Sequence, residues 1–170
     1  MVEMGLGLGL ESRFACVKRK YRWMMYVDGV FGRDKGGMKA LPPEKGARPS
    51  FNFKEVEVQH LNETVFYPIK PEFKPLNITL YDITGRSNGV TDWINQIYDA
   101  STGQWSAPPV NFKRSVTLEM YDGCGAIIEK WKYEDAYPSV IEYGDLDMSS
   151  SDYCVIDLTL RYDRAFKDNS

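Results

Sequence analysis

The strongest fold signal in this chain is the stretch Ser115-Val116-Thr117-Leu118-Glu119-Met120-Tyr121. Apolar and polar side chains alternate along it, which is the period of a β-strand that buries one face. Residues 122–125 follow with an aspartate and two glycines, and residues 126–133 form a second strand-like run. The two runs and the turn between them predict an antiparallel β-hairpin.

Further strand-like runs lie on both sides of this hairpin, at residues 21–27, 51–58, 64–67, 76–82 and 153–162. They are rich in aromatic residues, or they alternate with a period of two. We expect the run at 51–58 to bury one face and to expose the other. The run at 64–67 is expected to end at Pro68, because proline cannot donate to a strand ladder. Residues 134–151, with a proline and a glycine, are predicted to be irregular;.

Residues 90–100 carry the best helix pattern of the chain, and Thr91 can cap its first turn;. Its apolar stripe, which we expect to face the core, consists of Val90, Trp93, Ile94 and Ile97;. Because strands dominate and hairpins connect them, the expected fold is mainly β. It comprises two packed antiparallel sheets, in a sandwich or half-barrel, with one flanking α-helix.

The length of 170 residues is sufficient for one domain with a proper core;. We expect a flexible N-terminal arm at 1–20, a single β domain at 21–165 and a short C-terminal tail at 166–170. No apolar run is long enough for a membrane anchor. The basic cluster in the first 20 residues follows the apolar part, which is the reverse of the order in a signal peptide;.

The net charge of −3 excludes a generally basic nucleic-acid binder;. Its distribution is uneven, because residues 1–54 hold 11 Lys/Arg and 5 Asp/Glu, whereas residues 55–170 hold 10 and 19. One interpretation is chance together with a solvated basic segment. The other is that a basic region of one copy meets an acidic region of the next, which would steer head-to-tail assembly.

The sequence offers little for catalysis, and we expect no catalytic residue, no cofactor and no metal. His60 is the one histidine, and a solvated role is expected for it. An enzyme would have to pair it with Cys16 or Cys154, as base and nucleophile. These two cysteines and Cys124 are scattered and odd in number, which is typical of free thiols in a reducing compartment rather than of a metal cluster or disulfide framework.

The last third of the chain carries an ordered series of signals. Residues 113–123 lead into 127–133, and the aromatic-proline element 135–140, the acidic turn 144–147 and a final strand ending at 161–163 follow. This series resembles the C-terminal half of the tail tube proteins of contractile-tailed bacteriophages, which are related to the inner tubes of R-type pyocins and type VI secretion. Upstream, the Met38-Lys39-Ala40-Leu41-Pro42 stretch and the Asp92-Trp93 pair are similar to elements of the same family.

The resemblance implies a structural subunit and not an enzyme. Six copies would form a ring, and stacked rings would make the channel through which DNA passes during infection. The implied partners are further copies of the chain, the tail sheath, baseplate and terminator proteins, and the tape measure protein and genomic DNA inside the lumen. The implied location is the virion tail, assembled in the host cytoplasm. Alternatives are a baseplate tube-initiator or tail terminator ring of the same fold, or a type VI secretion or pyocin inner tube.

Candidate residues follow from this reading. The long loop 32–50 is the expected ring-to-ring contact, through Lys35, Lys39, Leu41 and Arg48;. The polar strand positions Asn77, Thr79, Thr117 and Glu119 are candidates for a lumen face, where few cations would let DNA slide. Candidate fold or subunit-contact elements taken from the resemblance are Trp93, Trp131, Tyr137, Pro138, Asp145 and Asp147.

Overall fold

The computed structural model describes residues 18–30, 33–34, 37–38, 43–82, 89–105 and 112–168. The longer elements are β1 (Trp23–Val27), β4 (Phe51–His60), β5 (Glu63–Phe73), β6 (Leu76–Tyr81), α1 (Gly89–Ile97), β9 (Arg114–Tyr121), β10 (Ile127–Glu142), β11 (Val155–Arg161) and β12 (Arg164–Asp168). The two-residue strands are β2 (Arg33–Asp34), β3 (Gly37–Met38), β7 (Tyr98–Asp99) and β8 (Gln104–Trp105). No helix in these ranges is long and apolar enough to cross a membrane.

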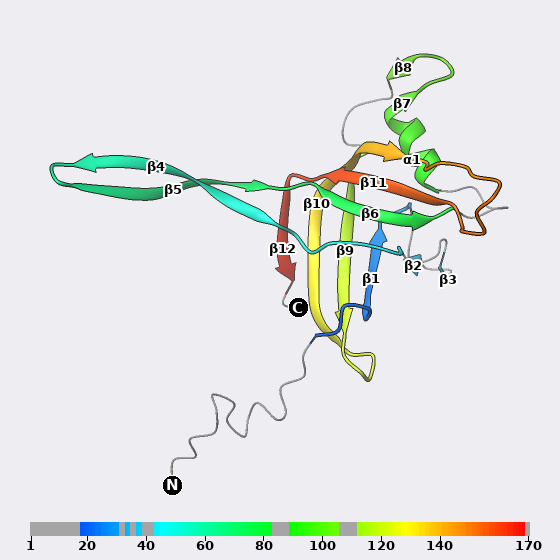
Figure 1. The fold of residues 1–170 in the computed structure, drawn as a ribbon, viewed down its shortest axis with the longest axis horizontal. Helices are drawn as coiled ribbons and strands as arrows, with labels where there is room; N and C mark the ends of the chain where they lie inside the picture. Colours follow the sequence, from blue (N-terminus) through cyan, green and yellow to red (C-terminus); the bar gives the residue numbers. More distant parts are fainter. Residues whose placement is uncertain are drawn as a thin grey trace, which may run out of the picture.

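The body is built around β10, which belongs to two antiparallel sheets (Figure 1). Its first part pairs with β9 and β12, and β1 pairs with the far side of β9; we call these four strands the long sheet. Its last part pairs with β11, which pairs with β6; we call these three the short sheet. In Figure 1 the strands of the long sheet run across those of the short sheet.

β10 changes sheet at an irregularity in its middle. Its register against β9 shifts between Tyr133 and Ala136, and its register against β11 shifts between Pro138 and Val140. Asp135, within this stretch, has a φ of 56°, which is unusual for a residue other than glycine;. Such bulges bend a strand and increase its twist, which lets one strand serve two crossing sheets.

Both sheets face one hydrophobic core. The alternating positions of β9 and β6 point into it, with Val116 wholly buried and Ile78 1% exposed. Tyr133 of β10 is also wholly buried, its hydroxyl donates to the Ala47 carbonyl oxygen at 3.0 Å, and its ring lies 5.0 Å from that of Tyr162. The expected fold class, two packed antiparallel sheets with one helix, is confirmed.

The buried tyrosines are expected to make the folded state less stable at alkaline pH. Burial raises the pKa of the Tyr133 and Tyr162 hydroxyls above the ordinary value of about 10;. A raised folded-state pKa gives stability that is present below pH ~10 and is lost above it, because the unfolded chain then gives up its protons more readily. We expect the melting temperature to fall steeply above pH ~10. Tyr133→Phe should flatten that fall, whereas Tyr21→Phe, at a ring that is 72% exposed, should leave it unchanged. An equal slope in the two variants would contradict this assignment.

The helix and several strand ends differ from the expected ones. α1 ends at Ile97 rather than at residue 100, because Tyr98 and Asp99 turn into the small β7–β8 hairpin, where the Tyr98 and Trp105 rings lie 5.1 Å apart. β12 extends the long sheet across position 165, where the end of the domain was expected. Residues 134–142, expected to be irregular, continue β10.

β5 does not end at Pro68, so that prediction is wrong. The strand continues through Pro68 and Pro71 to Phe73, and it pairs with β4 alone. A proline is tolerated in a strand with an unpaired side, because its missing N–H then removes no ladder bond. The β4–β5 hairpin is therefore a ribbon whose long edges carry no further strand among the described residues.

Candidate assembly surfaces

The β4–β5 hairpin, residues 51–73, projects from the body as an arm (Figure 1). Almost every side chain along it is exposed, including Phe66 at 60% and Tyr67 at 52%. The expectation that residues 51–58 bury one face is therefore wrong for the isolated chain. A two-stranded hairpin alone is marginally stable in water, and exposed apolar patches mark interaction surfaces.

The arm has two chemically different faces, because residues opposite each other in an antiparallel pair point to the same side. Val56 pairs with Tyr67 and Val58 pairs with Val65, which gives an apolar face. Glu57 pairs with Phe66 on the other side, and Glu55 lies next to Glu57 on that same side of the strand;. We call this second side the acidic face of the arm.

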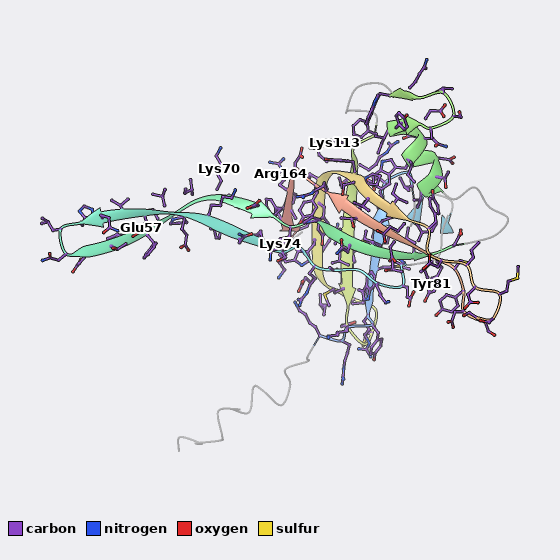
Figure 2. All side chains as sticks on the ribbon, turned by 45° about the horizontal axis from the view of Figure 1, so that its top comes forward. Glu57, Lys70, Lys74, Tyr81, Lys113 and Arg164 are labelled. Carbon is purple, nitrogen blue, oxygen red and sulfur yellow. The ribbon has the colours of Figure 1, made fainter. Side chains whose placement is uncertain are left out.

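Aromatic rings join the arm to the core at its base. The Phe51 and Phe73 rings are 5.5 Å apart, and the Phe73 and Tyr162 rings are 5.7 Å apart. Tyr162 in turn packs edge-on against buried Tyr133. The base is thus fixed to the body, whereas the outer part, where Glu57 lies in Figure 2, has no covering element.

The long sheet has two open edges. Among the described residues, β1 pairs only with β9, and β12 pairs only with β10. Each neighbouring pair in the order β1-β9-β10-β12 is antiparallel, so β1 and β12 run in opposite directions. The β12 edge of one copy can therefore pair antiparallel with the β1 edge of another. Open edges of this kind invite pairing with a second chain.

The face of the long sheet opposite the core is polar and carries both acidic and basic side chains. The Tyr26 and Tyr121 hydroxyls donate to the Glu119 carboxylate, and these two hydroxyl oxygens are 2.8 Å apart. Burial and the hydrogen bond to Glu119 raise the pKa of Tyr26. Lys130 pairs with Asp168 at 3.4 Å on the same face.

The four candidate lumen residues lie on two different sheets. Thr117 and Glu119 are outward-facing positions of β9 in the long sheet. Asn77 and Thr79 are outward-facing positions of β6 in the short sheet, where Thr79 donates to Asp157 at 2.5 Å. Since the two sheets pack on one core, these pairs point to opposite sides of the body. One surface cannot include all four.

The candidate ring-to-ring residues are only partly described. Lys35, Lys39 and Leu41 lie outside the described residues. Arg48 is described, and its guanidinium lies 3.7 Å from the buried Glu129 carboxylate. The second half of the loop thus packs on the body. The arm that follows it is an exposed candidate contact surface, and the sequence pattern did not identify it as one. Pro68 and Pro71 are the signal that could have indicated it, since two prolines in one strand require a free edge.

The other candidate residues range from buried (Trp93 and Pro138) through half-buried (Trp131 and Tyr137) to exposed (Asp145 and Asp147). Trp93 is buried, Pro138 is buried opposite Leu160, and the Trp131 indole N–H donates to Glu129 at 2.5 Å.

Tyr137 packs its ring 6.2 Å from that of Phe112. Asp145 and Asp147 are exposed in the loop after β10. Hydrogen bonds from the backbone N–H and the hydroxyl of Ser149 lower the pKa of Asp147.

The described residues that were considered for catalysis do not lie together in one site. His60 lies at the end of the arm opposite Glu63, whereas Cys154 is exposed next to β11, and Cys16 is outside the described residues. In the part of the chain that the structure describes, no three His, Cys, Asp or Glu side chains could hold a metal ion.

Comparisons with known proteins bear on the family and the fold of this chain. The sequence profile of the T4-like virus tail tube protein gp19 family matches residues 49–165. A curated relative, the tail tube protein of Serratia phage KSP90, is 26% identical over 168 residues and covers 95% of each chain.

Solved structures share the fold at low identity. A chain of the anti-feeding prophage cap, a tube-terminating cap, matches with a TM-score of 0.72 at 16% identity over 92% of this chain and 93% of that one. A chain of the sheath-tube complex of an extracellular contractile injection system matches with a TM-score of 0.65 at 17% identity over 89% and 91%.

A type six secretion system protein matches with a TM-score of 0.53 at 12% identity over 86% of this chain and 82% of that one. The profile match over residues 49–165 covers well over half of the chain and assigns the family. This chain belongs to the T4-like virus tail tube protein gp19 family.

Proposed function

We propose that this tail tube family member forms hexameric rings that stack into the channel for DNA passage. The observation that carries the proposal is the combination of two open sheet edges with a projecting arm that buries almost none of its side chains. A protein that acts as a monomer has little use for either feature, because both leave strands or apolar side chains available for association.

The ring is closed by the long sheet in this proposal. β12 of each copy pairs with β1 of the next, and the antiparallel direction of these edges supports a continuous sheet around the ring. Closure removes every open edge of the long sheet. The outward face with Tyr26, Thr117 and Glu119 then lines the lumen, and the short sheet with Asn77 and Thr79 lies outside.

Most cations that we place on the lumen face are paired within the subunit. Lys130 is paired with Asp168 and Arg164 is paired with Glu134, whereas Lys132, opposite Thr117, has no ion pair among the described residues. Unpaired Lys and Arg contact phosphates and hold DNA, so pairing of this kind favours passage over capture. The lumen would also contain the tape measure protein before ejection.

The remaining partners are proteins of the same machine. The relatives include chains from a sheath-tube complex, a tube-terminating cap and a baseplate. We infer that this chain contacts a tail sheath on the outside of the tube and baseplate and terminator proteins at its ends. It would be assembled in the host cytoplasm, and its role would be structural without enzymatic activity. Because the cap and baseplate chains share the fold, a specialised ring is the second candidate.

Electron microscopy and sedimentation of the purified chain test this function. The expected result is stacked rings with a stain-filled axial channel, in an amount that rises steeply with protein concentration. A chain that stays monomeric at high concentration, with or without a baseplate extract, would contradict the proposal. A single ring layer that never extends would favour the initiator or terminator role.

A further inference from the structure

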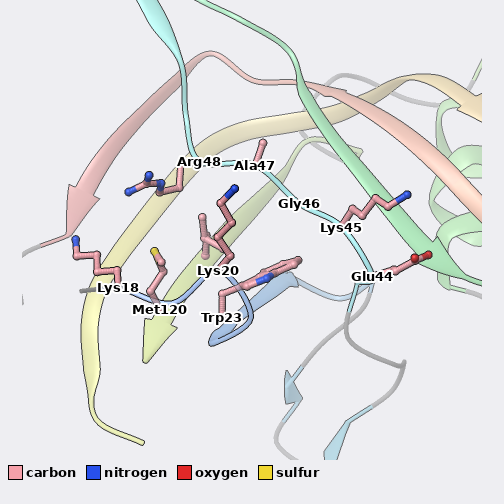
Figure 3. A pocket seen from close by; sticks show the side chains of 10 residues that line it. Lys18, Lys20, Trp23, Glu44, Lys45, Gly46, Ala47, Arg48 and Met120 are labelled. Atoms are coloured by element: carbon pink, nitrogen blue, oxygen red, sulfur yellow. The ribbon is translucent and has the colours of Figure 1, made fainter. Parts of the chain in front are cut away.

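A basic cleft lies over the end of the long sheet that carries the first residue of β1 and the last residues of β9 (Figure 3). It encloses about 540 Å³, and its floor is apolar, formed by Trp23, Leu118 and Met120. Its walls bear the cations Lys18, Lys20, Lys45 and Arg48 and one carboxylate, Glu44. Leu118 and Met120 are buried, at 3% and 8% exposed, whereas Trp23 is half-buried and the four cations are exposed.

Buried Glu129 accounts for only part of this positive charge. Its side chain is 4% exposed, it is paired with Lys18, and it lies 3.7 Å from the Arg48 guanidinium. The Trp131 indole N–H donates at 2.5 Å to Glu129 Oε1, the same oxygen that faces Arg48, whereas Lys18 contacts Oε2. Lys20 and Lys45 have no ion pair among the described residues, so they remain available to a ligand.

The wall formed by residues 44–48, which we call the strap, is held in place before any partner arrives. The Lys45 carbonyl oxygen accepts from the Thr79 N–H at 3.0 Å, and the Ala47 carbonyl oxygen accepts from the Tyr133 hydroxyl. Gly46 lies so close to Trp23 that a Cβ there would be 2.9 Å from the indole ring. A rigid wall lowers the ordering entropy that binding costs.

We propose that this basic cleft binds the acidic face of the arm of a second copy. The two surfaces match in charge and in apolar character. Glu55 and Glu57 complement Lys20 and Lys45, and Phe66, opposite Glu57, complements the half-buried Trp23 ring;. The proposal rests on the function above, since it names the surface that receives the arm within the assembly.

The geometry of one chain makes this a contact between copies. The strap runs directly into β4, so the arm begins beside its own cleft and extends away from it (Figures 2 and 3). A ten-residue strand spans roughly 33 Å, which is enough to reach across a neighbouring body;. Because arm and cleft are different surfaces, the contact is head-to-tail and propagates instead of closing a dimer.

The acidic loop after β10 is a less suitable occupant. Its Asp147 carboxylate accepts from both the backbone N–H and the hydroxyl of Ser149, whereas the Glu57 carboxylate accepts from the Gln59 side-chain amide alone among the described residues. Its acids follow an irregular backbone, whereas Glu55 and Glu57 form a regular row on one strand face. The loop nevertheless supplies a matched control for charge reversal.

Charge reversal and compensation test the contact. E55K/E57K and K20E/K45E are each expected to reduce sedimentable assembly roughly tenfold or more, because like charges then face each other. The quadruple variant restores opposite charges and should recover assembly. The matched control D145K/D152K should assemble as wild type does. All six positions are exposed, and melting temperatures equal to that of wild type at concentrations too low for assembly will show that the variants fold;.

Disulfide trapping identifies the pair directly. In a background with Cys16, Cys124 and Cys154 changed to serine, E57C with K45C should give intermolecular disulfides in assemblies. V56C with K45C, which places the thiol on the opposite arm face, should give far fewer.

The outcomes separate this inference from the proposed function. If wild type never assembles, the tube function itself fails. If wild type assembles and E55K/E57K assembles equally well, the tube function is supported and the arm-to-cleft contact is wrong. The same conclusion follows if K20E/K45E restores the assembly of D145K/D152K but not that of E55K/E57K.

Discussion

Replacing residues 54–70 by an Asn-Gly turn is expected to abolish assembly while the monomer keeps its fold. The replacement joins Phe53 to Pro71, which face each other in the hairpin, so the shortened ribbon can close in register;. The aromatic contacts of Phe51, Phe73 and Tyr162 at the base remain. Because the deleted side chains contribute nothing to the core, the melting temperature should stay within about 4 °C of that of wild type measured at a concentration too low for assembly;.

Analytical ultracentrifugation with thermal unfolding followed by circular dichroism provides the measurement. The deletion variant should sediment as a monomer at concentrations where wild type pellets. Assembly at wild-type levels would show that the arm is not an assembly contact. A large loss of stability would show instead that the arm belongs to the fold of the single subunit.

Trp93→Ala is expected to reduce the free energy of unfolding by about 3–5 kcal/mol. Trp93 is 1% exposed, it holds α1 on the core, and its indole N–H donates to the Phe112 carbonyl oxygen at 2.5 Å. The substitution leaves a large cavity and an unpaired carbonyl group. Trp93→Phe, which keeps an aromatic ring but loses the donor, should cost less.

Urea denaturation of the monomeric arm-deletion variant is the appropriate measurement, because assembly would otherwise add to the apparent stability. Asn95→Ala on the exposed side of α1 is the control, and it should change stability by no more than about 0.5 kcal/mol;. A loss below about 1 kcal/mol for Trp93→Ala would contradict its place as the helix anchor.

Strand alternation predicted burial correctly where the covering element lies in the same chain. Val116, Leu118 and Ile78 are buried, and the polar residues between them face outward. The same alternation at 51–58 predicted a half-buried strand, yet both faces of the arm are exposed. A period of two indicates that a strand has an apolar face. It does not indicate whether that face is covered by the same chain or by another.

Prolines were the main source of error in the strand boundaries. Pro138 indicated an irregular segment, but it lies where β10 has left β9 and pairs with β11 only, so its missing N–H interrupts no ladder. Pro68 and Pro71 are accommodated in the same way on the arm. Strand position within a sheet decides whether proline ends it, and this position is a tertiary property.

The sequence identified the family but located the contact surfaces less well. The expected lumen set combined Thr117 with Asn77 because both alternate with core residues, and only the order of strands shows that they face opposite sides. Arg48 was expected at a ring contact, and it lines the cleft beside Glu129. The uneven charge of the two chain segments has a structural counterpart, since a basic cleft lies in the first and the acidic face of the arm in the second.

An electron cryomicroscopy reconstruction of the assembled chain tests the central claim most directly. We expect rings of six with an axial channel, one continuous sheet in which β12 of each copy pairs antiparallel with β1 of the next, and every arm lying on another copy. A particle in which β1 and β12 remain unpaired, or in which the arm folds back on its own body, would contradict the account.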